Sequence, residues 1–301
     1  MEFNLVDLRL FVRVAEEGAI TRAAARQHLS LAAASARIKS LEQHAGVALF
    51  YREARGMRLT PAGSAFLHHA RGMLRQTEQL RSELQDYGGG LRGHLRLFAN
   101  TTAVMDFLPT LLPEFLARHP NINIDLQEKP NSEIARGVRD HRADLGIVAG
   151  AVDTLGLRAI HLSTDRLVLV VPRGHRLARR KSIAFADTLD EDHIGMHQGS
   201  TLQAYLSQIT EQIGRPLKLR IQLSNFDAMC RMIGGGVGVG IVPESAARRH
   251  LDAMRLVQIA LTDAWQWRER HILCRQEEAL PEYAQNLIDT LVDCFRGAPR
   301  A

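Results

Sequence analysis

The sequence predicts a two-part protein, with an all-α N-terminal part that includes a long helix and a C-terminal α/β part. Over residues 5–16, apolar residues recur at spacings of three and four, which predicts an amphipathic helix. Residues 61–87 carry a heptad pattern of apolar residues. From residue 93 onward, short apolar runs alternate with helical patterns, which predicts strand–helix–strand units and a parallel sheet. Together these three observations define the predicted fold class.

The composition is that of a globular protein. Hydrophobic residues make up 46% of the chain and charged residues 24%, close to the averages of folded domains. The opening residues mix apolar with charged side chains, and no apolar run reaches membrane-spanning length, so we expect neither an export signal nor contact with a membrane. Three distant cysteines, Cys230, Cys274 and Cys294, favour reduced thiols in a cytoplasmic protein over a disulfide framework.

Positive charge is concentrated near the N-terminus. The net charge is +5, and residues 1–92 alone carry 13 Lys and Arg against 9 Asp and Glu. A compact basic module neutralises phosphates and releases their counterions, so nucleic acid is the natural partner. Charge alone leaves a second interpretation equally open, a solvated basic surface without a partner.

The first predicted elements are three helices. Residues 5–16 form the first helix, which ends at Gly18. A second helix is predicted to begin with the hydroxyl of Thr21 as its cap, and a third to run from a Ser30 cap to about His44. Two short helices joined by a tight turn are typical of a helix-turn-helix.

In a helix-turn-helix the N-terminal residues of the second helix enter the major groove of DNA. The basic segment 51–59 that follows predicts a two-stranded wing, whose arginines would contact phosphates or the minor groove. From composition alone, Ala32–Ala34 also fit a buried face of good helix formers, and that alternative stays open. The residues predicted to contact DNA are Thr21, Ser30, Leu31, Ala32, Ser35, Arg37, Lys39, Arg52, Arg55 and Arg58.

Residues 5–70 resemble the N-terminal domain of the LysR-type transcriptional regulators. The residues that carry the resemblance are Leu8, Phe11, Ala15, Gly18, Thr21, Ala23, Ala24, Ser30, Ser35, Ile38, Leu41, Glu42, Gly46, Leu49, Phe50, Arg52, Leu59, Thr60, Pro61, Ala62 and Gly63. The resemblance implies that residues 1–60 are a winged helix-turn-helix that binds double-stranded DNA. The chain departs from the family pattern at Ala19, Gln27 and Leu31. Because Leu31 replaces a glutamine that could read adenine, the base preference of other members does not carry over.

A long helix follows the wing. Thr60 supplies a capping hydroxyl and Pro61 occupies the first helical position, where its missing N–H costs nothing. The heptad positions are Phe66, Ala70, Met73, Thr77, Leu80, Leu84 and Tyr87. We expect residues 61–90 to form a linker and dimerisation helix with a glycine hinge, and the resemblance implies a homotetramer, a dimer of dimers. The alternative is a stripe buried within the chain.

The C-terminal part alternates strands and helices. Strands are predicted at residues 95–99, 122–126, 144–148, 166–171, 193–196, 218–223 and 237–242. Helices are predicted at residues 108–119, 132–141, 201–213, from about 227, and at 281–295.

This part resembles the LysR-family effector domain, which has the two-lobed fold of periplasmic solute-binding proteins. The matching residues are Leu108, Pro109, Leu112, Phe115, His119, Pro120, Asp144, Leu145 and the run Gly234–Pro243. The resemblance implies an effector-binding domain over residues 91–301, with lobe I at about 93–164 and 268–301 and lobe II at about 165–267.

Ligands of such sheets bind beyond the carboxyl ends of strands, where helix N-termini offer free N–H groups. The residues predicted to line the effector cleft are Asn100, Thr101, Thr102, Val148, Gln198, Gly199, Ser200, Thr201 and Phe226. Those at helix starts also fit a second interpretation, in which they only cap their helices. The helix ends favour an anionic small molecule as effector, and we expect no cofactor, no metal and no catalytic residue.

We expect effector binding to change the closure of the two lobes and so the spacing of the DNA-binding domains, with RNA polymerase as a further partner. The Gly234–Gly240 run lacks both the spacing and the lysine of a nucleotide-binding loop. His193 and His197 fall on a predicted strand and loop, where a metal pair at helical spacing does not form. No constellation of catalytic residues is present, so we do not expect an enzyme. The main alternative is a solute-binding protein with a non-functional DNA module.

Overall fold

The computed structural model describes residues 4–53, 56–86, 93–276 and 280–296. The chain divides into two compact units, one of residues 1–92 with 140–142 and one of residues 93–139 with 143–301. The predicted fold class is confirmed: helices dominate the first unit, and the second is a two-lobed α/β structure. Among the described residues, no helix has the length and apolar character that crossing a bilayer requires.

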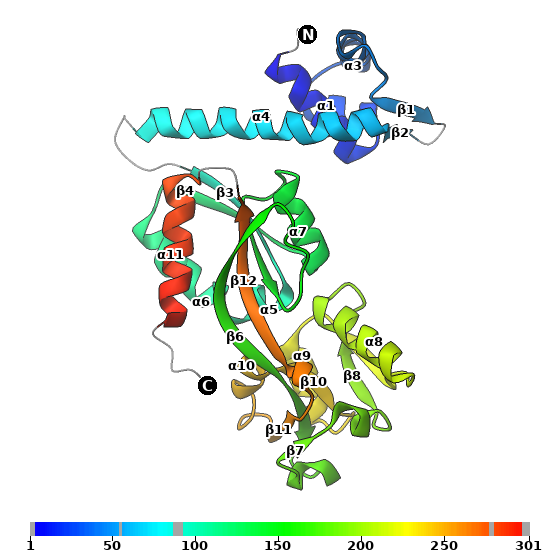
Figure 1. Ribbon diagram of the computed structural model, residues 1–301, viewed down its shortest axis with the longest axis vertical. Helices are drawn as coiled ribbons and strands as arrows, with labels where there is room; N and C mark the ends of the chain where they lie inside the picture. Colours follow the sequence, from blue (N-terminus) through cyan, green and yellow to red (C-terminus); the bar gives the residue numbers. More distant parts are fainter. Residues whose placement is uncertain (1–3, 54–55, 87–92, 277–279, 297–301) are drawn as a thin grey trace. The chain divides into compact units, whose positions relative to one another are not determined.

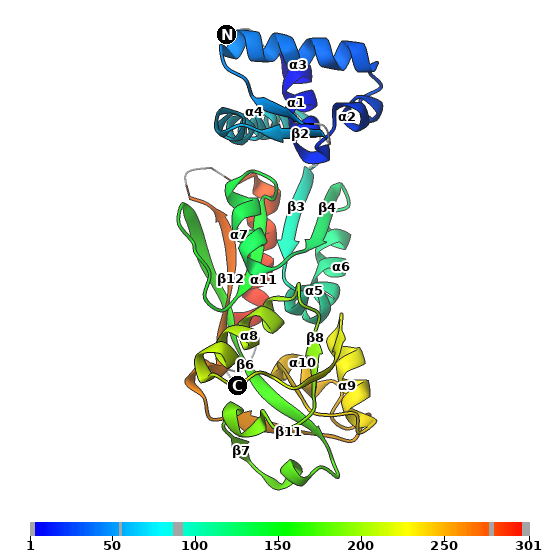
Figure 2. The same ribbon diagram turned by 90° about the vertical axis from the view of Figure 1, so that its right-hand side faces the viewer.

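Three helices and a strand pair build the N-terminal unit. Helix α1 spans Leu5–Glu17, α2 spans Ile20–Arg26 and α3 spans Leu31–Ala45. They lie together with the first part of α4 (Figure 2). Gly18 ends α1 in the left-handed conformation, at φ 62°. The Ser30 hydroxyl caps α3 as predicted. The Thr21 prediction is wrong, because α2 starts at Ile20 with Ala19 at the N-cap position and has no side-chain cap.

The wing is a short antiparallel hairpin. Strand β1 spans Phe50–Glu53 and β2 spans Gly56–Leu59, with Phe50 opposite Leu59 and Glu53 opposite Gly56. The N–H of Met57 donates to the carbonyl of Gly18 at 2.8 Å, which ties the hairpin to the end of α1.

Helix α4 spans Pro61–Asp86 and begins at a tightly packed cap. The Thr60 hydroxyl donates to the Ala48 carbonyl at 2.8 Å and accepts from the Gly63 N–H at 2.9 Å. A Cβ on Gly63 would lie 2.0 Å from the Leu49 carbonyl oxygen, so no larger residue fits there without a shift. The Thr60–Pro61 prediction of a helix start is therefore confirmed, and the glycine two positions later has a packing reason.

The heptad stripe of α4 divides into two parts. Phe66 packs edge-on against Phe11 with ring centroids 4.8 Å apart, and Ala70 is buried, so these positions complete the core of the N-terminal unit. Farther along, Met73 and Leu80 are exposed. At the end of the stripe, Tyr87 lies outside the described residues.

Lobe I of the C-terminal unit is a sheet covered by helices on both faces (Figure 1). Its elements are β3 (Gly93–Ala99), α5 (Thr101–Asp106), α6 (Leu108–Arg118), β4 (Ile122–Glu128), α7 (Asn131–Arg139) and β5 (Leu145–Ala149). Strand β3 runs parallel to both β4 and β5. The last helix, α11, spans Glu282–Arg296 and packs near α6 and β6.

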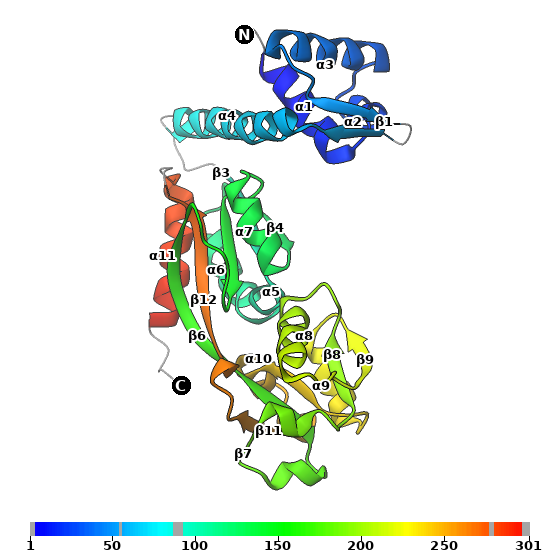
Figure 3. The ribbon, with the colours of Figure 1, turned by 45° about the vertical axis from the view of Figure 1, so that its right-hand side comes forward.

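Two long strands pass from lobe I into lobe II. Strand β6 spans Leu157–Pro172 and pairs antiparallel with β12, Trp267–Arg275. The two run side by side between the lobes in Figure 3. Their presence corrects two predictions: the strand predicted at 166–171 starts at Leu157, and the sheet is mixed rather than parallel. In the first half of β6 only Leu157 and Leu162 are buried, and this half lacks the apolar run that marks the second half.

Lobe II is built around the second half of β6, whose residues Leu167–Val171 are all buried. Strands β10 (Gly240–Pro243) and β11 (Leu256–Leu261) pair with it antiparallel, and β7 (Ser182–Ile183) pairs with β11. Strands β8 (His193–Met196) and β9 (Leu219–Leu223) form a parallel pair. The remaining elements are α8 (Thr201–Ile213), α9 (Phe226–Gly234), α10 (Glu244–Arg248) and three short 3₁₀ segments at Arg176–Arg179, Phe185–Thr188 and Ala264–Gln266.

Candidate nucleic-acid interface and ligand cleft

The start of α3 presents small and apolar side chains to solvent. Leu31 and Ala32 are exposed, Ser35 is half-buried, and Ala34 is buried in the core. Ala34 therefore fits the interpretation of a buried face, whereas Ala32 is accessible and its contact with DNA stays a prediction. Thr21, which does not cap α2, is exposed.

Some of the basic side chains predicted to contact DNA already form ion pairs within the chain, and others do not. Nη1 of Arg37 lies 2.7 Å from the Asp7 carboxylate, an ion pair that ties α3 to α1. Lys39 and Arg52 are exposed. On the wing, Arg58 pairs with Glu53 at 2.9 Å and its guanidinium carbon lies 4.8 Å from the centre of the Tyr51 ring. Arg55 lies outside the described residues.

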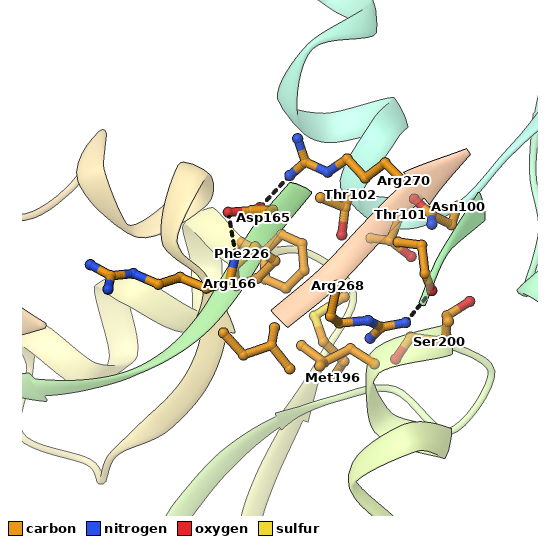
Figure 4. Close-up of a pocket in the computed structure, with 15 residues that line it drawn as sticks. Asn100, Thr101, Thr102, Asp165, Arg166, Met196, Ser200, Phe226, Arg268 and Arg270 are labelled. Carbon is orange, nitrogen blue, oxygen red and sulfur yellow. Dashed lines mark hydrogen bonds and ion pairs between the residues drawn. The ribbon is translucent and has the colours of Figure 1, made fainter. Parts of the chain in front are cut away.

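A pocket opens between the two lobes of the C-terminal unit (Figure 4). The free volume among its side chains is about 20 Å³, which is room for about one water molecule in this conformation. Six of the predicted residues line it: Asn100, Thr101, Thr102, Ser200, Thr201 and Phe226. They come from the starts of α5, α8 and α9.

Three of the predicted residues do not line this pocket. The side chain of Val148 packs into the apolar cluster between β5 and α7, and it is the next residue, Ala149, that borders the pocket. Gln198 and Gly199 are exposed in the turn before α8. Sequence spacing placed these residues near a strand end or helix start but could not give the direction of each side chain.

Capping and pocket lining coexist at the helix starts. Asn100 caps α5 by accepting from the Ala103 N–H at 3.0 Å, and Ser200 caps α8 by accepting from Gln203 at 3.1 Å. Thr101 does not cap, because its hydroxyl donates to the Glu128 carboxylate at 2.5 Å. Thr201 accepts from the backbone N–H of Asn131 at 3.1 Å, a bond that joins lobe II to lobe I.

Two arginines in the pocket are neutralised by carboxylates. Arg166 forms a forked pair with Glu244, with N···O distances of 2.8 and 2.7 Å. Arg270 is paired with Asp165 and also donates to the Ser245 hydroxyl at 2.9 Å. Neither guanidinium therefore presents an uncompensated charge to a ligand.

Arg268 differs from both. It is 8% exposed, donates to the Ala149 carbonyl, and has its guanidinium carbon 4.6 Å from the centre of the Tyr205 ring. None of the described carboxylates forms an ion pair with it, and its Nε has no hydrogen-bond partner among the described residues. Burial lowers the pKa of Arg268 to about 10, so it remains a cation at neutral pH. In Figure 4 its side chain extends toward Ser200, whereas that of Arg166 points the other way.

Comparison with known proteins identifies the family. A model of the LysR substrate binding domain matches residues 88–296, and a model of the bacterial regulatory helix-turn-helix protein, lysR family, matches residues 5–64. The chain belongs to the LysR family of transcriptional regulators. This LysR-type regulator is 27% identical over 244 residues to the HTH-type transcriptional regulator CysL of Bacillus subtilis, covering 81% of this chain and 82% of CysL.

Solved structures share the fold of this LysR-type regulator. A variant of full-length OxyR from Pseudomonas aeruginosa superposes with a TM-score of 0.73 at 23% identity, covering 100% of this chain and 97% of OxyR. The regulatory domain of CcmR from Synechocystis PCC6803, solved in complex with 2-PG, gives a TM-score of 0.60 at 23% identity and covers 68% of this chain and 99% of that domain. The chain is thus a DNA-binding regulator with a domain for a small-molecule effector.

Sequence reasoning missed the charged residues of the pocket in this LysR-type regulator. Arg268 and Arg270 stand two apart on β12, which places them on the same face of the strand, and Asp165 lies on the neighbouring β6. The signal was present as three consecutive charged residues of alternating sign, Arg268, Glu269 and Arg270, shortly before an apolar run. Such a pattern is typical of an exposed strand end, and only the pairing with β6 shows that these arginines are buried.

The Arg166–Glu244 pair gives the regulator a pH dependence. The hydrogen bond from Arg166 holds the pKa of Glu244 below its ordinary value, so the pair stabilises the fold above the pKa of an unfolded glutamate and this stability is lost as pH falls through the folded pKa. Glu244→Gln should therefore lower the free energy of unfolding by about 1–2 kcal/mol at pH 7 and by progressively less below about pH 5. Urea unfolding at a series of pH values measures this difference. A gap that stays constant down to pH 3 contradicts the assignment.

Proposed function

We propose that this LysR-type regulator binds a small anionic effector in the cleft between its lobes and transmits that binding to DNA. The observation that carries the proposal is Arg268, a buried cation without a carboxylate partner in a pocket. A buried unpaired charge is costly, and a ligand carboxylate or phosphate would offset that cost. The relatives are named as regulators, and we propose a regulator rather than an enzyme.

The effector contacts follow from the pocket. We propose that the anionic group binds between Arg268 and the start of α8, where Ser200 and Thr201 stand at the positive end of the helix dipole. Asn100, Thr101 and Thr102 would contact the effector from lobe I. The complex of the similarly folded CcmR domain with 2-PG supports a small-molecule ligand for this domain.

DNA binding is proposed for the surface formed by α3 and the wing. The exposed start of α3, with Ser30, Leu31, Ala32 and Ser35, would enter the major groove. We propose that Thr21, Arg37, Lys39, Arg52, Arg55 and Arg58 contact the phosphate backbone or the minor groove. Because Arg37 and Arg58 already have carboxylate partners, their contribution should be smaller than that of Lys39 and Arg52.

Signal transmission is proposed to work through lobe closure. The bond from the Asn131 N–H to the Thr201 hydroxyl joins the lobes directly beside the pocket, so a ligand there competes with it or reinforces it. Either effect shifts the balance between open and closed forms, which can alter the spacing of DNA-binding domains in an oligomer. RNA polymerase would sense the altered complex at a promoter in the cytoplasm.

Assembly is proposed to use the outer part of α4. Met73 and Leu80 are 43% and 55% exposed on a long helix, which suits pairing with a second copy, and two such dimers would form the tetramer. Leu80→Asp should yield smaller particles in analytical ultracentrifugation and weaker operator binding, because a charge at the centre of the seam opposes pairing. Val47→Asp, at a similarly exposed position outside the helix, is the control. Unchanged assembly of Leu80→Asp would remove the seam from the proposal.

A mobility-shift titration tests the proposed function. The full chain is titrated against DNA flanking its coding region and against a genomic fragment library, with excess non-specific competitor, and anionic metabolites are then added singly. We expect competitor-resistant binding whose affinity or footprint changes with one anion. Failure across the library would favour the alternative, a solute-binding protein with a non-functional DNA module.

A further inference from the structure

Helix α3, which is proposed to enter the major groove, carries an aliphatic side chain at its start. Leu31 is the first residue of α3, directly after the Ser30 cap, and is 50% exposed. The core-facing residues of the same helix, Ala34, Ile38 and Leu41, are at most 3% exposed. Exposed leucines are common on protein surfaces, so exposure alone does not indicate a function for Leu31. Its place at the start of α3 does, because this part of the helix is proposed to enter the major groove.

Polar base-reading groups are scarce around Leu31. Residues 30–36 hold two serines, one leucine and four alanines, with no amide, carboxylate or guanidinium. The Ser30 hydroxyl already accepts from the Ala33 N–H at 3.2 Å. The next cation along the helix, Arg37, forms an ion pair with Asp7 at 2.7 Å. The tip of this helix therefore offers mainly apolar contact to base edges.

The apolar feature of the major groove is the 5-methyl group of thymine. We propose that Leu31 is a specificity-determining residue that packs against a thymine 5-methyl group in each half-site of the operator. The inference rests on the proposed function, because it requires α3 to enter the major groove. At this position the base would then be recognised by apolar contact with its methyl group and not by a hydrogen bond to its edge.

Removing single methyl groups from DNA tests the proposal. Operators are first selected from a pool of random duplexes with the full chain, and each thymine of the selected site is then replaced by deoxyuridine, which pairs identically but lacks the methyl group. We expect one symmetry-related pair of positions at which replacement weakens binding about fourfold per half-site, the effect of exposing one methyl group. Leu31→Ala should bind the unmodified site correspondingly less well and lose this penalty, while Val47→Ala, at an exposed position outside the helix, should keep it.

The outcomes separate the inference from the proposed function. If selection yields no preferred sequence, the proposed DNA-binding function fails and the inference fails with it. If a site is selected but no deoxyuridine replacement matters, or if Leu31→Ala retains the full penalty, DNA binding stands and the role of Leu31 is overturned. Leu31→Met, which keeps an aliphatic contact, should retain the penalty, and its loss in that variant would also count against the proposal.

Discussion

Arg268→Met is expected to abolish the response to the effector while leaving DNA binding in the absence of effector intact. The variant removes the pocket cation that lacks a carboxylate partner, so an anionic ligand loses its charge-assisted hydrogen bonds. The expected loss is about 2–4 kcal/mol, or roughly 30- to 1000-fold in affinity. Isothermal titration with the anion found in the mobility-shift screen measures it.

Two controls make the Arg268 result specific. Arg268→Lys keeps the charge but not the planar fork, so affinity should fall only about tenfold. Arg173→Met removes an exposed arginine of lobe II and should change nothing. The substitution removes the cost of burying an unpaired cation but also removes its hydrogen bond to the Ala149 carbonyl, so the melting temperature of Arg268→Met should stay near that of the wild type. Wild-type affinity in this variant would mean that the anion binds elsewhere.

Asp144→Ala is expected to cause the largest loss of stability. Its side chain is 0% exposed, and it accepts from the Arg96 backbone N–H at 2.8 Å and from the Arg96 guanidinium at 3.1 Å. The guanidinium of Arg275 lies 3.9 Å away. Asp144 therefore links β3 and β12 at the start of β5, and its removal leaves buried charge uncompensated, at a cost of about 3–5 kcal/mol.

The stability change can be read from fluorescence. Both tryptophans of the chain, Trp265 and Trp267, lie in the C-terminal unit, so urea unfolding followed by tryptophan emission reports on that unit. Asp252→Ala, at an exposed carboxylate, should stay within about 0.5 kcal/mol of the wild type. Asp144→Asn should fall between the two, because it keeps the size and one acceptor oxygen. Wild-type stability of Asp144→Ala would show that the two arginines find other partners.

Local signals predicted the helices well. Helix α8 has the predicted bounds, and Ser30 and Thr60 cap helices as expected, because a capping hydroxyl acts on backbone groups only a few residues away. The prediction for Thr21 was wrong because threonine also occurs within the first turn of a helix, where it does not cap. The polar residues at helix starts, which are five of the fifteen residues that line the pocket, were predictable for the same local reason.

The strands that carry charge were not predictable. Strand β12 contains the buried residues Arg268, Arg270 and Arg275. Because these buried positions are charged, the strand lacks the apolar pattern by which buried strands are recognised in a sequence. Their burial depends on partners far away in the sequence; Asp165, for example, is 105 positions from Arg270. No local window of sequence contains that information, so the cationic side of the pocket emerges only once β6 and β12 are paired.

Arg268 lies opposite Asp165 in the backbone register of the β6–β12 ribbon, and its place on this ribbon has a mechanical consequence. Backbone hydrogen bonds along the ribbon resist sliding of one strand past the other, but they allow the ribbon to bend and twist. A ligand held by Arg268 would therefore be attached to the ribbon itself rather than to one of the lobes that it connects. An anion bound there would act on the ribbon between the lobes, and a small displacement of the ribbon would become larger with distance toward the far ends of both lobes.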